Sequence, residues 1–160
     1  MSLDSNIRRI LWTSLLQADQ EQRYWHCKAC NYVRWDFRTK IFLAIATSSA
    51  VGGWAIWSEC QYVWKSLTVV SSLLSVVMPF LSLNDKVLSM TEVHAKWLQL
   101  MHTYEAMWRD QDLLDEAQIR SQLDAGKRTE GELSAKAISL PGSDRELGAK
   151  TYEQVVKDRT

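Results

Sequence analysis

Two charge-free runs constrain this chain more than any other feature of its sequence. Charged residues stop at Lys40 and resume at Glu59, and they stop again at Lys65 and resume at Asp85. An α-helix rises about 1.5 Å per residue, so each run is close to the length that crosses a hydrocarbon core of about 30 Å. A helix on the surface of a globular protein normally carries a charged stripe, and neither run has one.

The runs predict an all-α fold, a two-span transmembrane helical hairpin whose helices extend into a cytosolic helical bundle. The predicted segments are an N-terminal cytosolic amphipathic helix 1–40, a first transmembrane helix 41–58, an external link 59–65, a second transmembrane helix 66–84, a cytosolic helix 85–124, and C-terminal short helices or a tail 125–160. Trp and Tyr residues flank both runs, as they do at a membrane interface. The alternative is a soluble helical hairpin with a Trp-rich core.

Basic residues near the runs predict the orientation of the hairpin. Arg34, Arg38 and Lys40 precede the first run, Lys86 follows the second, and the link holds only Lys65. The positive-inside rule then places both termini in the cytosol, where these basic residues can also meet anionic lipid headgroups. Three cysteines without a secretory signal agree with a reducing compartment.

The segments outside the runs have helical periodicity and predict two long helices that pack on each other. Before the first run, apolar residues recur on one stripe from Ile7 to Ala18. After the second run, the residues predicted to pack in the cytosol are Trp97, Met101, Tyr104 and Trp108. The sequence "DAGKRTEG" predicts a break in the helical pattern near Gly126.

Small and hydroxylated residues form one face in each run. The pore-lining candidates of the second run are Thr68, Ser71, Ser72, Ser75 and Ser82. The packing candidates of the first run are Ala44, Ser48, Ser49, Gly52, Gly53 and Ala55. Small residues let membrane helices approach closely, and a hydroxyl face can alternatively meet water when several copies assemble. Both interpretations predict a homo-oligomer.

The sequence contains no recognisable catalytic or cofactor-binding motif, and we predict that the protein is not an enzyme. Cys27 and Cys30 have CxxC spacing, but a structural zinc site needs four ligands and there is no second pair. If the hairpin folds about its link, His94 comes level with His26 and both cysteines, so whether the thiols bind metal stays open. Basic and acidic residues balance at 19 each, which gives no indication of nucleic-acid binding.

The layout resembles the SLATT family, the SMODS- and SLOG-associating two-transmembrane effector domains. The resemblance covers roughly Ile7 to Leu123 and is carried by "YWHCKACNYVRWDFRTK" before the first run, "SSAVGGW" within it, the brief link, and "NDKVLSMTEVHAKWLQLMHTYEAMW" after the second. It implies an effector in the bacterial inner membrane that oligomerises and forms or gates a pore in antiphage defence by abortive infection. The implied trigger is a nucleotidyltransferase or another signal-producing partner in the cytosol. The alternative is a non-conducting, membrane-anchored scaffold that recruits a cytosolic enzyme.

Overall fold

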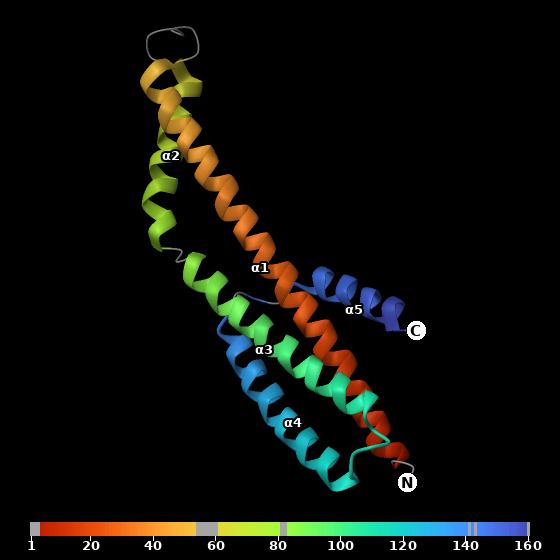
Figure 1. The fold of residues 1–160 in the computed structure, drawn as a ribbon. Helices are drawn as coiled ribbons and strands as arrows, with labels where there is room; N and C mark the ends of the chain where they lie inside the picture. Colours follow the sequence, from red (N-terminus) through yellow and green to blue (C-terminus); the bar gives the residue numbers. More distant parts are fainter. Residues whose placement is uncertain (1–3, 54–60, 81–82, 141, 143, 160) are drawn as a thin grey trace. The chain divides into compact units, whose positions relative to one another are not determined.

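The structure is a computed structural model that describes residues 4–53, 61–80, 83–140, 142 and 144–159. Side chains are described for these residues except 46–53, 61, 63–64, 67–68 and 78–80. The elements are α1 (Ser5–Gly53), α2 (Gln61–Phe80), α3 (Leu83–Arg109), α4 (Glu116–Ile138) and α5 (Arg145–Arg159) (Figure 1). The regular structure of the described residues is all helical, so this part of the predicted fold class is confirmed.

The chain divides into two compact units. Unit 1 consists of Met1–Ala29 and Leu88–Thr160, and unit 2 consists of Cys30–Val87. Unit 1 therefore holds the beginning of α1, most of α3, and all of α4 and α5. Unit 2 holds the rest of α1, α2 and the first residues of α3.

Unit 1 is a helical bundle with a continuous apolar core. Its helix α1 starts after Asp4, whose side chain accepts a hydrogen bond from the Asn6 backbone N–H at 3.1 Å and so caps the first turn. The predicted stripes of α1 and α3 are mostly buried, at steps of three and four residues, but Ile10 of the α1 stripe is 41% exposed. The buried residues are Ile7, Leu11, Leu15, Ala18, Trp25 and Ala29 on α1 and Met90, Val93, Trp97, Leu100, Met101, Tyr104 and Met107 on α3. Trp108 is half-buried and packs on Trp12, with ring centroids 4.9 Å apart.

Helix α4 runs through Gly126, where the sequence predicted a break. Its buried positions, which include Gly126 and Glu130, follow steps of three and four residues and form one face. A Cβ atom on Gly126 would lie 2.4 Å from the hydroxyl of Tyr104, so only glycine leaves room for that ring. The Tyr104 hydroxyl donates a 2.7 Å hydrogen bond to Glu130, which also pairs with Lys127 at 2.7 Å. The glycine is thus a packing residue within the helix rather than its end.

Helix α5 is fixed to α1 by a network of charges around a buried carboxylate. Asp19 is 1% exposed and accepts hydrogen bonds from Arg23 at 2.8 Å and from Arg159, the last residue of α5, at 3.0 Å. Arg23 also pairs with Asp158 at 2.6 Å. Burial acts to raise the pKa of Asp19, but hydrogen bonds from Arg23, Gln22 and Arg159 outweigh it and lower that pKa. The ionised carboxylate therefore stabilises the docked helix.

The prediction of a transmembrane hairpin with spans at 41–58 and 66–84 is wrong. Within the described residues, no helix combines the length and the apolar character that a membrane crossing requires.

The absence of charge was a misleading criterion, because it ignored the hydroxyl groups of the second run. Of the residues from Ser66 to Phe80, one third are Ser or Thr. Each hydroxyl makes the transfer of the helix from water into an apolar medium less favourable. The ends of the predicted spans, 54–58 and 81–82, lie outside the described residues. Helix α2 begins at Gln61, inside the predicted external link 59–65, and α3 begins at Leu83, inside the predicted second span.

Candidate interaction surface of unit 2

Unit 2 carries most of the exposed apolar side chains of the described chain. Twelve of the eighteen large apolar side chains that are exposed belong to it, although it is the smaller unit. We call these twelve the unit 2 apolar surface: Val33, Trp35, Phe37, Ile41, Phe42 and Ile45 on α1, and Tyr62, Val69, Val70, Leu73, Val76 and Val77 on α2. Among the side chains that the structure describes in unit 2, only Ser71 is buried.

The α2 part of this surface follows the spacing of a packing helix. Val69, Leu73 and Val76 are separated by four and three residues, and Val70 and Val77 lie beside them. Residues at these steps form one stripe along a helix, as in the seam of a helical bundle. Leu73 is 61% exposed, so the stripe is not covered by the chain's own described residues.

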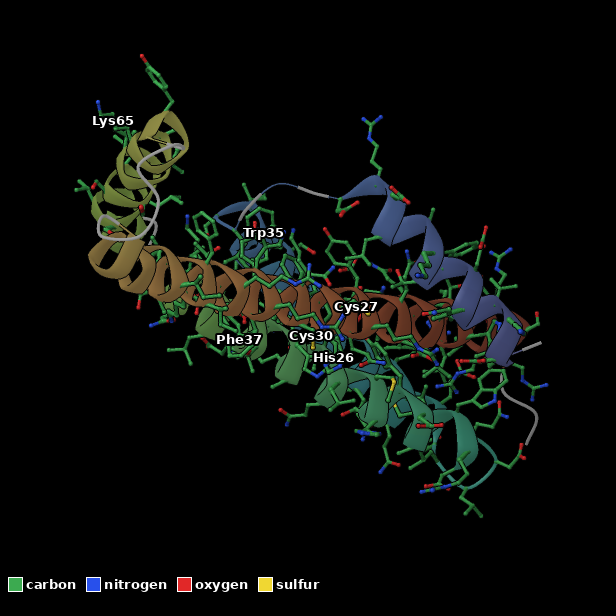
Figure 2. All side chains as sticks on the ribbon, turned by 90° about the horizontal axis from the view of Figure 1, so that it is seen from above. His26, Cys27, Cys30, Trp35, Phe37 and Lys65 are labelled. Carbon is green, nitrogen blue, oxygen red and sulfur yellow. The ribbon has the colours of Figure 1, made fainter. Side chains whose placement is uncertain are left out.

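The α1 part of the surface is wider, because aromatic residues project from different sides of the helix. Trp35 is 72% exposed, and Figure 2 shows Trp35 and Phe37 pointing away from α1 on different sides. Large exposed patches of this kind mark contacts with other proteins or with lipid. Aromatic side chains are the commonest anchors of such contacts, because they bury a large area with few rotatable bonds.

One of the predicted pore-lining hydroxyls, that of Ser75, bonds within α2. Ser75 donates to the carbonyl oxygen of Ser71 at 2.8 Å, which is the usual local bond of a helical serine. Ser71 itself is buried and Ser72 is exposed. The side chain of Thr68 and all of Ser82 lie outside the described residues. The geometry therefore brings Ser71 and Ser75 together but assigns neither to a water-filled path.

The predicted packing residues of the first run are described only in part. Ala44 is exposed on α1. Ser48, Ser49, Gly52 and Gly53 belong to α1, but their side chains are not among those described, and Ala55 lies outside the described residues. The small-residue stripe consequently stays a prediction.

The predicted basic residues beside the first run are exposed, and one of them has a near partner. Arg34 and Arg38 are exposed on α1, and Lys86 is half-buried on α3. Lys40 is exposed and forms an ion pair with Asp36 at 2.5 Å. That i,i+4 spacing was visible in the sequence and was missed, although such ion pairs commonly stabilise a helix.

The CxxC pair lies on α1, and His26 and His94 meet in unit 1. Cys27 and Cys30 are both half-buried (Figure 2). The rings of His26 and His94 have centroids 5.2 Å apart, and Nδ1 of His94 lies 2.9 Å from the carbonyl oxygen of Gln22. No group of three or more His, Cys, Asp or Glu side chains in the described chain is placed to hold a metal ion.

The arrangement offers a broad apolar surface on two helices and a separately folded bundle. Sequence reasoning recognised the apolar runs, but a run of apolar residues does not identify what covers it. Comparison of the chain with protein-family models, with curated proteins and with solved structures finds no match.

Proposed function

We propose that this protein is a helical assembly module, whose unit 2 apolar surface is buried against further copies of the same chain. The observation that supports the proposal is the contrast in burial. The apolar stripes of unit 1 are mostly covered within the chain, whereas most of the large apolar side chains described in unit 2 are exposed. A second copy presents the same stripe, so a two-fold pairing would cover both at once.

The energetics favour association over leaving this surface in water. Burying one large apolar side chain yields about 1.5–3 kcal/mol, and association costs about 4–15 kcal/mol in lost freedom of motion. A few side chains of the unit 2 apolar surface are therefore enough to offset the cost, and twelve are exposed. Uncovered, such a surface would aggregate without defined geometry.

The test is the mass of the protein in solution as a function of concentration. Leu73→Glu places a charge in the middle of the α2 stripe and removes one buried leucine from the proposed contact. We expect the association constant to fall about tenfold to a hundredfold, as measured by analytical ultracentrifugation. The matched control is Leu113→Glu, the same change at an exposed leucine of unit 1, which should leave the mass unchanged.

A monomeric wild-type protein at all concentrations, without aggregation, would contradict the proposal. Equal loss of assembly in Leu73→Glu and Leu113→Glu would also contradict it, because the effect would then come from net charge. In the proposed assembly, unit 1 remains available to recruit a cytosolic partner enzyme, which corresponds to the scaffold role without any membrane crossing.

A second candidate is the membrane-active effector of bacterial antiphage defence that the SLATT resemblance implies. It is supported by the same exposed side chains, because an apolar surface that protein does not cover can contact lipid acyl chains. In this candidate the homo-oligomer disrupts the inner membrane after a signal from a nucleotidyltransferase or another partner.

Vesicle flotation and cell physiology separate the two candidates. The effector candidate predicts that the wild-type protein floats with liposomes and depolarises cells on activation, and that Leu73→Glu does neither. The assembly module predicts defined oligomers in aqueous buffer and no lipid-dependent flotation. Protein that neither floats nor changes membrane potential, yet assembles, would remove the effector candidate.

A further inference from the structure

A cleft in unit 1 has the composition of a ligand site. It has a volume of about 530 Å³ and lies between α1, the end of α4 and the start of α5. Ring and aliphatic side chains form its walls, and four charged residues line it: Glu21, Lys28, Asp144 and Arg145. We call it the Lys28 cleft. It shares no residue with the unit 2 apolar surface.

Lys28 is a cation held almost out of solvent. The residue is 5% exposed, and its Nζ donates hydrogen bonds to the Tyr24 hydroxyl at 3.0 Å and to the Gly142 carbonyl at 2.9 Å. The same Nζ lies 5.1 Å from the ring centroid of Tyr24 and 4.9 Å from that of Trp25. A buried ammonium is costly unless it is compensated, and the two rings, the two oxygen atoms and the nearby Glu21 carboxylate all contribute to its compensation.

The Tyr24 side chain lines the cleft, and its hydroxyl has a hydrogen left to donate. Its oxygen accepts hydrogen bonds from Lys28 Nζ at 3.0 Å and from the Asp144 backbone N–H at 3.0 Å. Two accepted bonds use the lone pairs of a phenol oxygen, so its own hydrogen can be given to an acceptor atom of a ligand. The neighbouring ammonium also polarises the O–H bond and makes it a stronger donor.

Arg145 adds a second cation at the rim. It is exposed, lines the cleft and has no ion-pair partner among the described residues. Asp144 is engaged at the start of α5, where its Oδ1 accepts the Leu147 backbone N–H at 3.1 Å. Glu21 is engaged by the indole N–H of Trp25 at 3.1 Å. The groups left for a ligand are therefore mainly donors, beside an apolar wall that includes Ala137 and Leu140.

We propose that the Lys28 cleft binds a small anion carried on an apolar body, namely a carboxylate or phosphate monoester attached to a ring or a short aliphatic chain. The anionic group would take the Tyr24 hydroxyl and the Arg145 guanidinium, within the field of Lys28. The apolar body would lie against Trp25 and Leu140. This inference is independent of the proposed assembly, because every residue involved belongs to unit 1.

The probe for the test is phenyl phosphate, with benzyl alcohol as the neutral ring and inorganic phosphate as the bare anion. A ligand that binds only the native state raises the unfolding midpoint, and ten times its Kd should raise that of the full chain by about 3 °C. We expect a rise with phenyl phosphate at about 10 mM, a much smaller rise with inorganic phosphate, and none with benzyl alcohol.

Two variants locate the site, and the midpoint rise of each is measured from that variant's own midpoint without ligand. Tyr24→Phe removes the hydroxyl but keeps the ring, and Arg145→Gln removes the rim cation; both should lose most of the midpoint rise. The matched control is Arg128→Gln, the same change at an exposed arginine of α4 that does not line the cleft. An unchanged rise in both cleft variants would overturn the proposal. So would the absence of any rise in the wild type, or an equal rise with benzyl alcohol.

The pH dependence of binding provides a second readout that a structural role would not produce. Burial raises the pKa of Glu21 above 4.5, its usual value. A bound anion repels the ionised carboxylate. Phenyl phosphate itself takes up a proton near about pH 6, so the wild type is compared with Glu21→Gln on the same probe at each pH. The charged groups that face Glu21 are Lys28 on α1 and Asp144 and Arg145 at α5; the α4 residues of the cleft carry none. Glu21→Gln should bind phenyl phosphate more tightly than the wild type at pH 7, and this advantage should shrink as the pH falls toward the raised pKa of Glu21.

Discussion

Leu11 in unit 1 and Leu73 in unit 2 are identical side chains on helices, yet the first has no exposed area and the second is 61% exposed. Leu11 contributes to the stability of a single chain, since the other helices of the bundle cover it. Leu73 can contribute to stability only through contact with atoms outside the described residues of the chain. One apolar pattern can therefore specify a fold in one region and a contact in another.

The largest effect should come from truncating the core of unit 1. Leu11→Ala removes a fully buried side chain and leaves a cavity, so the free energy of unfolding should fall by about 2–5 kcal/mol in urea denaturation. The control is Leu113→Ala at an exposed leucine of the same unit, which should change that free energy by less than about 0.5 kcal/mol. Similar losses in both variants would contradict the distinction between buried and exposed leucines, because burial would then not determine the change in the free energy of unfolding.

The next effect should come from the buried carboxylate that joins α5 to α1. Asp19→Asn removes the charge that Arg23 and Arg159 share, and we expect a loss of about 1.5–3 kcal/mol at pH 7. The exposed Asp112→Asn is the matched control and should have little effect.

The same variant has a defined pH signature. The pKa of Asp19 is lowered from 3.8 in the folded chain, so its contribution is fully present above pH 3.8 and is lost as the pH falls through the lower, folded value. The difference in stability between wild type and Asp19→Asn should therefore shrink below pH 3.8. A difference that stays constant down to pH 2 would mean that the charge does not stabilise the docked helix.

Alanine substitution of two glycines of α4 should change the free energy of unfolding in opposite directions, and by less than the changes above. Gly126→Ala brings a Cβ to 2.4 Å from the Tyr104 hydroxyl, so the ring must move and its bond to Glu130 weakens. We expect a loss of about 1–3 kcal/mol, since a buried hydroxyl then lacks its partner. Gly131→Ala meets no atom within 4 Å and should stabilise the helix by about 0.5–1 kcal/mol. Thermal unfolding of both proteins checks the sign, and stabilisation by both substitutions would show that Tyr104 moves freely.

The smallest effect on the isolated chain should come from unit 2. Leu73→Ala should change the free energy of unfolding by less than about 0.5 kcal/mol at the lowest protein concentration, because no cavity forms. At higher concentrations the wild type should gain stability by mass action, and the variant should gain less. A loss at low concentration as large as that of Leu11→Ala would show that the chain itself covers Leu73.

Much of unit 1 was predictable from the sequence, because periodicity records which face of a helix is covered. The spacing of Trp97, Met101 and Tyr104 identified the buried face of α3. The expectation that a folded hairpin brings His94 level with His26 agrees with ring centroids 5.2 Å apart. In both cases the sequence information is local and repeats along a helix.

Other features depend on partners that are distant in sequence. Gly126 reads as a helix break by composition, and only the position of Tyr104, in another helix, makes it a packing residue. The Lys28 cleft likewise needs α5, a mostly polar helix whose docking depends on Asp19 and Arg159 rather than on an apolar stripe. The apolar surface of unit 2 was visible as a pattern, but a pattern of apolar residues does not distinguish lipid from protein.

The contact between Trp12 and Trp108 gives the bundle an optical signal of its own. Two indoles with centroids 4.9 Å apart and planes inclined by 44° are close enough for their excited states to couple, which produces a paired positive and negative band in circular dichroism. The coupling weakens steeply with separation, so this band reports whether the N-terminal part of α1 and the C-terminal part of α3 are joined. Movement of these two helix ends can thus be followed in real time without attaching a dye. The Trp12→Phe variant, which lacks the indole pair, is the control spectrum.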